Sequence, residues 1–490
     1  MNLPIEPFDL VVFLVYLGLV MALGMWVGKG AKDLSSYLLG DRQLPWWAIL
    51  GSIVATETST VTFLSVPGIV FAEGGNMTFL QLSLGYILGR ILVSLLLLPG
   101  YFQGKIFSAY ELLEKHFGVE TKRVASVIFL LARNFGDALR LFLTALVLEA
   151  MFDLSLGWSI VIIGVLTIAY TLVGGMKAVI WNDCLQLLVY MLGGVLIAFI
   201  IAGRLPEGWS GIVSFGQETG RLQVLDFEWD WTEPYTFWAG LIGGVFLAVG
   251  THGVDQMLVQ RYLAAKSRHH ASAALITSGF VVALQFAFFL FLGVALAAYY
   301  HQPQFAEVDF SEWSGDKALA TFIVEELPGG IGLIGFILAG VFAAAMSTLS
   351  SSLNSSATVV VNDFFKAKED APEEMLWQSR VWTAVFGVIQ MVIAFAASGV
   401  TRSVVDEVLG IAGMTVGLLL GLFALSRIFP TCGQRGAIVG LLVASLILIF
   451  VRFVMPPVYG LSIAGTWYAL IGSTSTVLIA SLVHYRSVWK

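Results

Sequence analysis

Charged side chains are scarce in this sequence of 490 residues. Asp, Glu, Lys and Arg make up 12% of the chain, whereas the hydrophobic residue types make up 58%. Soluble globular chains are about 25% charged and about 45–50% apolar, so this composition nearly excludes a soluble enzyme. The net charge of −7 is spread thinly, and because no basic patch is present we expect no nucleic-acid partner.

Cysteines and enzyme motifs are scarce too. The two cysteines, Cys184 and Cys432, lie far apart without metal-ligand spacing, so we expect both to be buried thiols. The sequence contains no phosphate-binding P-loop, no H-E-x-x-H zinc motif and no G-x-S-x-G nucleophile motif. It gives no indication of nucleotide hydrolysis, zinc chemistry or acyl transfer, and we expect that the chain is not an enzyme.

Long apolar runs, by contrast, fill most of the chain. A membrane-spanning helix needs about 20 apolar residues, and these runs predict an all-α integral membrane protein with about thirteen transmembrane helices. The predicted spans are 8–29, 45–73, 78–101, 122–151, 155–174, 180–203, 234–262, 271–300, 330–363, 377–398, 403–427, 434–454 and 461–485. We expect residues 1–490 to form a single transmembrane domain, with a core at about 45–427 and flanking helices at 8–29, 434–454 and 461–485.

Lysine and arginine are divided unequally between the connections. If the N-terminus lies outside, most of the 26 lysines and arginines fall in connections on the cytoplasmic side, as the positive-inside rule requires. Lys29 and Lys32 follow the first apolar run rather than precede it, so we expect a retained span and not a signal peptide. The prediction is a multi-pass protein of the plasma (inner) membrane with its N-terminus outside and its C-terminus in the cytoplasm.

The order of the spans allows an internal inverted repeat. Spans 2–6 and 7–11 are two units of five, and because five is odd the second unit begins from the opposite side of the membrane. Such units are a recurrent plan of secondary transporters. The residues themselves show no detectable repeat.

Polar stretches interrupt two of the predicted spans. The second span reads GSIVATETSTVTFLSVPG (51–68), and the ninth reads AAAMSTLSSSLNSSAT (343–358). A single hydroxyl in a membrane helix can bond back to a carbonyl one turn earlier, but runs of this length favour unwound backbone that faces protein or water. Unwound carbonyls and hydroxyls are the hard oxygen ligands that a sodium ion prefers.

Several ionisable side chains lie within the spans, where each is costly unless it is paired or functional. Arg133, Asp137 and Arg140 share one helix face, which allows either an internal ion pair or contact with a solute. We expect Asp255 to pair with Arg261 beside it. The other ionisable residues within spans are Glu57, Arg90, Asp183 and His252, and for Arg90 we expect a snorkelling or helix-pairing role.

Four segments carry a resemblance to a known family. They are PWWAILGSIVATETSTVTFLSVPG (45–68), GGMKAVIWNDCLQ (174–186), DQMLVQRYLAAKS (255–267) and AAAMSTLSSSLNSSATVVVNDFF (343–365). In these segments the chain resembles the sodium:solute symporter family, which includes transporters of sugars, sialic acid, proline and vitamins. The resemblance extends over nearly the whole chain and implies the leucine-transporter fold, with two inverted five-helix repeats and a broken helix in span 2.

The resemblance also implies one or two sodium ions as coupling ions. The principal sodium site would use the carbonyls of Ala55, Thr58 and Ala344 and the hydroxyls of Ser347 and Thr348. A second sodium ion, as some members of the family hold, would be bound by Asp183, Ser347, Ser350 and Ser351.

The solute site implied by the resemblance lies beside the break in span 2. Ser59, Thr62 and Gln81 match solute-contacting positions of the bacterial sialic acid type, and Thr251 and His252 match aromatic positions of the sugar type. Two departures stand out: Gly136 takes the place of a carboxylate-binding arginine, with Arg140 one turn away, and Glu57 replaces a small polar residue. The complete set of predicted solute-binding residues is Glu57, Ser59, Thr62, Gln81, Arg133, Asp137, Arg140, Thr251 and His252.

These residues favour sodium-coupled symport of a small polar solute, a sugar or sugar acid, into the cell by alternating access. Sodium-coupled symport of an amino acid or other zwitterion is an alternative, as is proton coupling through Glu57 or His252. A membrane sensor and a passive channel are further alternatives, which the sequence disfavours. The expected partners are the solute, sodium ions and the lipid bilayer, and the oligomeric state stays open, a monomer included.

Overall fold

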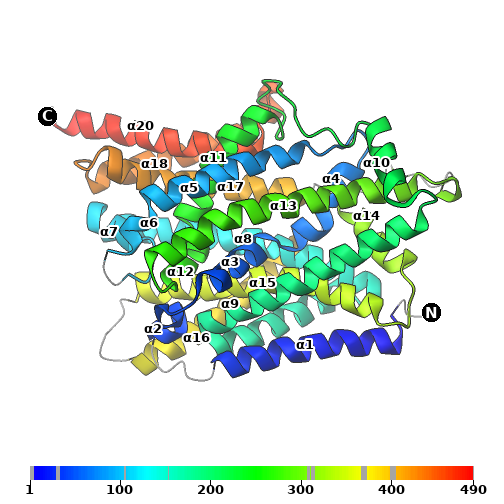
Figure 1. The fold of residues 1–490 in the computed structure, drawn as a ribbon. Helices are drawn as coiled ribbons and strands as arrows, with labels where there is room; N and C mark the ends of the chain where they lie inside the picture. The colour runs from blue at the N-terminus through cyan, green and yellow to red at the C-terminus, as the bar shows by residue number, and fades with distance from the viewer. Residues whose placement is uncertain are drawn as a thin grey trace.

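The structure, a computed structural model, is a bundle of long helices (Figure 1). It describes residues 5–28, 34–103, 106–152, 154–305, 310, 315–365, 372–397 and 404–488. Within these ranges there is no strand longer than the isolated bridge between Leu44 and Ala265. The N- and C-termini lie at opposite ends of the bundle, with α1 along one face and α20 along the opposite face.

The predicted spans coincide with helical elements. In chain order these are α1 (Pro7–Gly28), α3 (Trp46–Glu57) with η2 (Val61–Ser65) and α4 (Val66–Phe71), η3 (Thr78–Gln81) with α5 (Leu82–Leu96) and α6 (Leu98–Tyr101), α8 (Val119–Phe152), α9 (Leu156–Arg204), η4 (Ala239–Gly243) with α11 (Gly244–Gly253) and α12 (Gln256–Leu263), α13 (Arg268–Tyr300), α15 (Leu333–Asp363), α16 (Pro372–Ala396), α17 (Val404–Ile428), α18 (Gln434–Ile449) with η8 (Phe450–Val454) and α19 (Met455–Tyr459), and η9 (Gly465–Trp467) with α20 (Tyr468–Val488). Short helices in the connections are α2 (Leu34–Leu39), η1 (Gly40–Arg42), α7 (Glu111–Phe117), α10 (Gly208–Glu218), η5 (Pro303–Phe305), α14 (Gly315–Thr321) and η6 (Phe322–Glu326).

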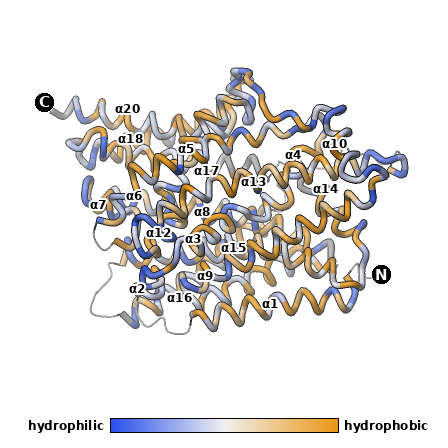
Figure 2. The backbone as a smooth tube through the Cα atoms, viewed as in Figure 1, coloured by the Kyte–Doolittle hydropathy of each residue, from blue (hydrophilic) through white to orange (hydrophobic). Residues whose placement is uncertain are grey.

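The apolar lengths agree with a membrane protein. Nine helices among the described residues are long and apolar enough to cross a membrane, or eleven if each of two bent pairs is one span. The other two predicted spans are helical as well: one is α8, which contains several charged residues, and the other is the shorter segment Leu156–Leu172. In Figure 2, the orange of apolar residues recurs along the long helices. Large apolar side chains such as Leu95 and Val392 are more than half exposed, as expected of surfaces that face lipid.

Gly175 separates two predicted spans inside the long element α9. Its backbone has φ 57° and ψ −161°, which is not helical. A Cβ at this position would lie 2.5 Å from the Tyr37 carbonyl oxygen. Glycine is therefore required at the point where one span ends and the next begins.

We expect Gly175→Ala to destabilise the protein by about 1–3 kcal/mol, because it forces a side chain into a backbone conformation reserved for glycine. The melting temperature of the purified protein measures this. Gly203→Ala is the matched control, since Gly203 lies on the same element and no atom is within 4 Å of its Cβ position. Equal melting temperatures for the two variants would contradict the prediction.

The predicted break in span 2 is confirmed. Helix α3 ends at Glu57, and the following segment Val61–Phe71 is bent away from it by 62°. Thr58, at φ −84° and ψ 84°, forms the corner.

A second break lies in span 7, which the hydropathy pattern presented as continuous. Here Ala239–Gly253 and Gln256–Leu263 meet at 57°. Asp255 caps the second half by accepting a hydrogen bond from the Met257 amide (2.9 Å). Spans 2 and 7 are the first spans of the two five-span units, so the breaks occupy equivalent places in the expected inverted repeat.

The predicted interruption of span 9 is wrong. Helix α15 is continuous from Leu333 to Asp363. Several of its hydroxyls bond back to its own carbonyls, as Ser351 does to Ser347 (2.7 Å) and Thr358 to Asn354 (2.8 Å), and this satisfies those hydroxyls without unwinding the helix. The polar stretch is instead buried, because α15 lies at the centre of the bundle and is the most buried of the apolar helices described.

Candidate functional site

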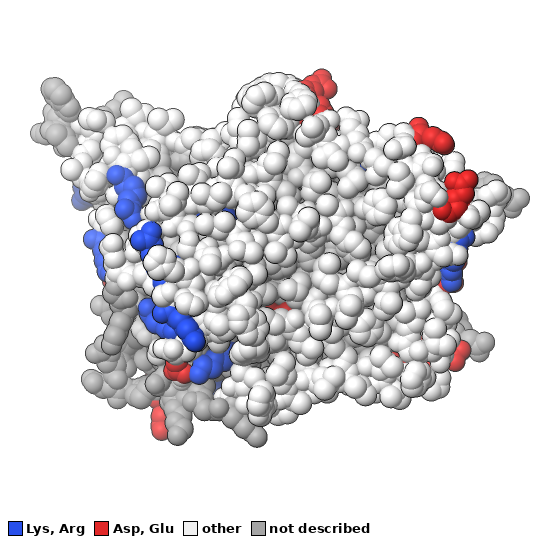
Figure 3. All heavy atoms as spheres, viewed as in Figure 1, with Lys and Arg blue, Asp and Glu red and all other residues white. Residues whose placement is uncertain are grey.

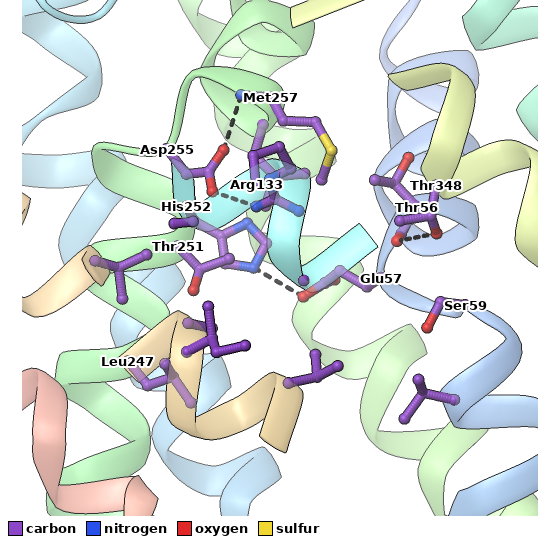
Figure 4. A pocket seen from close by; sticks show the side chains of 18 of the residues that line it. Thr56, Glu57, Ser59, Arg133, Leu247, Thr251, His252, Asp255, Met257 and Thr348 are labelled. Atoms are coloured by element: carbon purple, nitrogen blue, oxygen red, sulfur yellow. Dashed lines mark hydrogen bonds and ion pairs between the residues drawn. The ribbon is translucent and has the colours of Figure 1, made fainter. Parts of the chain in front are cut away.

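A cavity of about 160 Å³ lies between the breaks in spans 2 and 7 (Figure 4). Residues of α3, α8, α11 and α17 line it together with the chain between α3 and α4. Seven of the predicted solute-binding residues are on its wall: Glu57, Ser59, Thr62, Arg133, Arg140, Thr251 and His252. Its other walls are largely apolar, including Phe79, Tyr86 and Phe286.

Gln81 and Asp137 are not among the lining residues. The Gln81 amide is 2% exposed and bonds the Tyr235 carbonyl (2.7 Å) and the Asp226 amide (3.1 Å). It therefore holds the connection after α10 rather than a solute. Asp137 is fully buried behind the cavity wall.

Glu57, the last residue of α3, is held by an ion pair and a hydrogen bond. Arg90 of α5 lies 2.6 Å from each of its carboxylate oxygens, and His252 Nε2 lies 2.9 Å away. The Arg90 guanidinium is fully buried and also bonds the Ser278 hydroxyl (2.7 Å). His252 Nδ1 lies 2.8 Å from the Tyr262 hydroxyl. Of the two expected roles of Arg90, the structure shows helix pairing and not snorkelling.

Of the two alternatives for this face of α8, the structure shows ion pairs among Arg133, Asp137 and Arg140. Asp137 Oδ1 lies 2.5 Å from Arg140 Nη1 and 3.7 Å from Arg133 Nη1. Arg140 Nε also donates to the Ser59 hydroxyl (3.3 Å), which connects α8 to the break in span 2.

The expected pair of Asp255 with Arg261 is wrong. Asp255 is bonded to Arg133 instead (Figure 4). The bend between α11 and α12 explains this, because it turns Asp255 toward α8 while Arg261 points into the contact with α3, α9 and α15. Arg133 and Arg140 on the cavity wall are thus paired with Asp255, also on the wall, and with Asp137 behind it, so these charges balance.

Carbonyl oxygens at the end of α3 lie beside the middle of α15. The Ser59 amide turns to the Glu57 carbonyl (3.1 Å), so the Ala55 carbonyl loses the partner that a continuous helix would supply. From the other side, the Thr348 hydroxyl lies 3.0 Å from the Thr56 carbonyl and 3.5 Å from the Ala344 carbonyl. Carbonyl and hydroxyl oxygens from both elements therefore meet here, and this donor set fits a sodium ion.

Two predicted ligands of the principal site use their side chains elsewhere. The Ser347 hydroxyl donates to Asp183 Oδ1 (2.8 Å). The Thr58 hydroxyl bonds Gln285 (2.5 Å), whose amide nitrogen bonds the Tyr190 hydroxyl (2.9 Å). For Thr58 the predicted ligand is its carbonyl, so this contact leaves the prediction open. Gln285 and Tyr190 were not predicted, although a glutamine within an apolar span is a visible signal.

The residues predicted to bind a second sodium ion surround an arginine. Asp183 accepts hydrogen bonds from Ser347 and from Ser52 (2.5 Å), and its Oδ2 lies 3.1 Å from Arg261 Nη2. Ser351 is also bonded to Arg261. The Ser350 hydroxyl donates to the Ser347 carbonyl (3.2 Å). Sequence patterns missed Arg261, Ser52 and Thr56 as members of this cluster.

Two broken spans around a central cavity, beside a place where carbonyl and hydroxyl oxygens of two helices meet, are typical of ion-coupled secondary transporters. The chain belongs to the sodium:solute symporter family, whose model matches residues 37–444. It is a multi-pass membrane protein that moves a small solute together with sodium, and it is not an enzyme.

Named relatives agree over almost the whole chain. The sodium/sialic acid symporter SiaT of Proteus mirabilis (strain HI4320) is 30% identical over 476 residues, which are 95% of this chain and 92% of SiaT. The sodium-dependent multivitamin transporter of Oryctolagus cuniculus is 32% identical over 450 residues, 90% of this chain and 69% of that protein. A solved structure of a Na⁺-coupled sialic acid symporter, substrate-bound and outward-open, has a TM-score of 0.87 at 29% identity and covers 98% of both chains. The expected leucine-transporter fold and sodium as coupling ion are thereby confirmed.

Proposed function

We propose that the protein imports a small hydroxylated carboxylate, a sugar acid or a close chemical relative, together with sodium by alternating access. The observation that carries the proposal is Arg140, which lies on the cavity wall bonded to the Ser59 hydroxyl (3.3 Å). A guanidinium beside hydroxyls suits a carboxylate and a neighbouring hydroxyl of one solute. Thr62 and Thr251 add hydroxyls to the same wall, and the similarity to sialic acid symporters supports the same class.

The size of the cavity favours a compact solute. The cavity measures about 160 Å³. The bound sodium ion would be held by the carbonyls of Ala55, Thr58 and Ala344 and the hydroxyls of Ser347 and Thr348. Thr56 and Thr348 lie both at this site and on the cavity wall. Sodium there would order the broken end of α3 and so raise solute affinity, and by linkage the solute would raise sodium affinity equally.

The orientation proposed is N-terminus outside and C-terminus in the cytoplasm of a plasma (inner) membrane. In support, Lys and Arg gather at the end of the molecule that carries α2 and α7, and Asp and Glu gather toward the other end (Figure 3). The positive-inside rule places the end rich in lysine and arginine in the cytoplasm. We propose that the whole chain acts as one transporter domain.

A thermal-shift screen of the purified protein tests this function. We expect sugar acids to stabilise the protein in sodium and not in potassium, because bound sodium raises the affinity for the solute. A ligand at 100 times its dissociation constant adds about 2.7 kcal/mol to the free energy of unfolding. Stabilisation by neutral sugars alone would contradict the proposed class. Arg140→Gln should weaken binding of the acid more than binding of the corresponding neutral sugar.

Two alternative functions, transport of a zwitterion and coupling to protons, are each supported by a separate observation. Glu57 on the cavity wall could meet the amine of a zwitterion, although Arg90 and His252 already hold it. The hydrogen-bonded series of Glu57, His252 and Tyr262 could instead carry a proton. Stabilisation by amino acids in the same screen would favour the first, and uptake driven by a pH gradient without sodium would favour the second.

A further inference from the structure

A second, larger cavity of about 690 Å³ lies between α5, α11, α17 and α20, which pack side by side (Figure 1). Apart from Arg427, Ser473 and Thr474, the residues that line it are apolar. Both hydroxyls donate within α20, from Ser473 to the Ala469 carbonyl (2.8 Å) and from Thr474 to the Leu470 carbonyl (2.7 Å). We call this cavity the lateral groove, and it presents the charge of Arg427 on an otherwise apolar surface.

The lateral groove is open toward the outside of the bundle. Leu420 and Phe423 are buried in it, whereas Leu96, Ile428 and Leu478 also line it and are 60%, 60% and 64% exposed. On a membrane-spanning bundle such apolar side chains face the hydrocarbon of the bilayer. An acyl chain can therefore enter the groove from the side, without any opening of the protein.

The groove follows α17 to the end of this helix. Leu420, Phe423 and Arg427 are three and four residues apart and so share one helix face. The stretch from Leu420 to Arg427 is about 10 Å long at 1.5 Å per residue, and the apolar half of a bilayer is about 15 Å thick. Arg427 is in the last turn of α17, so the groove connects the apolar interior of one leaflet with the depth at which phosphate groups begin.

The Arg427 guanidinium is available to an anion. The side chain is exposed, and it forms no ion pair with any residue that the structure describes. A Cβ on Gly100 would lie 3.4 Å from its Nη2 atom, so the guanidinium lies between the ends of α17 and α6. A guanidinium suits a phosphate, and basic groups between membrane helices bind anionic headgroups. The charge at the end of the groove therefore favours a lipid with a net negative headgroup.

We propose that the lateral groove binds one anionic phospholipid, with an acyl chain between the four helices and its phosphate on Arg427. The lipid contacts the outer side of two helices whose inner side forms the solute cavity. On α11, Val249 lines the groove and Thr251 the cavity, and on α17 the corresponding residues are Leu420 and Leu419. A bound lipid thus restrains the two helices beside the solute, whichever solute is transported.

Native mass spectrometry of the purified full-length protein in detergent tests the proposal. The probes are dioleoyl phosphatidylglycerol and dioleoyl phosphatidylcholine, which have the same chains and differ in headgroup charge. One basic residue near an anionic surface contributes about fivefold in affinity, so we expect phosphatidylglycerol to bind about fivefold more tightly. Arg427→Gln should remove this difference. Arg435→Gln is the matched control and should keep it, because Arg435 is exposed at the start of α18 and does not line the groove.

A variant that fills the groove tests the contact with the acyl chain. Ala424→Trp keeps Arg427 but places a ring among the lining residues, so it should weaken binding of both lipids. Equal binding of the two lipids to the wild-type protein would overturn the inference, even if Ala424→Trp does not fold. An equal loss in Arg435→Gln and Arg427→Gln would overturn it too. Displacement of the lipid by an equal concentration of inorganic phosphate would indicate a site for a free anion instead, and a dimer that Ala424→Trp separates would indicate a second copy of the chain; either result contradicts the proposal.

Discussion

Replacing Ser347 and Thr348 together by alanine is expected to abolish sodium stimulation of solute uptake while the protein still folds. The double variant removes both side-chain ligands proposed for the principal site. It also removes the hydrogen bond from Thr348 to the Thr56 carbonyl (3.0 Å), which joins α15 to the broken end of α3. Loss of a residue that only supports a metal ligand typically costs 10–100-fold in metal affinity, so loss of two ligands should cost at least roughly that much. Uptake into proteoliposomes under a sodium gradient, compared with a potassium gradient, measures the effect.

The same helix provides a matched control. Ser355 and Ser356 are buried on α15, two turns further along the chain, and the Ser355 hydroxyl bonds the Ser352 carbonyl of its own helix (3.1 Å). Ser355→Ala with Ser356→Ala should retain sodium stimulation. Because Ser347 also donates to Asp183, Thr348→Ala alone separates loss of the ion from disturbance of that cluster. Unchanged sodium-driven uptake in the Ser347 and Thr348 double variant would refute the assignment.

Hydropathy was sufficient to predict the spans but not every break. In the polar run at 51–68 the chain leaves the helix at Thr58, whereas Pro67 and Gly68 of the same run lie inside α4. The run at 343–358 has no proline or glycine, and its helix is intact, with some hydroxyls such as that of Ser351 bonded back to a carbonyl of the same helix. The break in span 7 occurs at the sequence Gly253-Val254-Asp255, where the only cue was a possible N-cap aspartate. A polar run therefore predicted burial, whereas neither break lies at a proline, and the position of each break could not be found from the run alone.

Pairing of charges could be predicted only within one helix. The spacing of Arg133, Asp137 and Arg140 is sufficient to place them together, because four residues make about one turn, and the structure agrees. Pairs between helices depend on how the two bends rotate α12, and no local pattern contains that information. For this reason Asp255 was assigned to the nearby Arg261, while each of them pairs with a residue distant in sequence.

The ion pair of Arg90 with Glu57 should make a large contribution to the stability of the protein, because the Arg90 side chain is fully buried. Arg90→Leu would leave the Glu57 carboxylate with only His252 as a close partner, in a site where the glutamate side chain is 14% exposed. Removal of one partner of a buried pair typically costs about 3–5 kcal/mol. We expect a correspondingly large fall in the melting temperature of the purified protein.

Combining Arg90→Leu with Glu57→Gln should restore much of that stability, because no unpaired charge then remains. Arg123 and Glu120 are the matched exposed pair, at 3.3 Å with 41% and 56% of their side chains accessible, and Arg123→Ala should cost no more than about 1 kcal/mol. If the double variant were as unstable as Arg90→Leu alone, the arginine would stabilise the protein through packing and not through its charge. Restored stability without restored solute binding would show that the cavity needs the charged pair of Arg90 and Glu57, and not stability alone, to bind its solute.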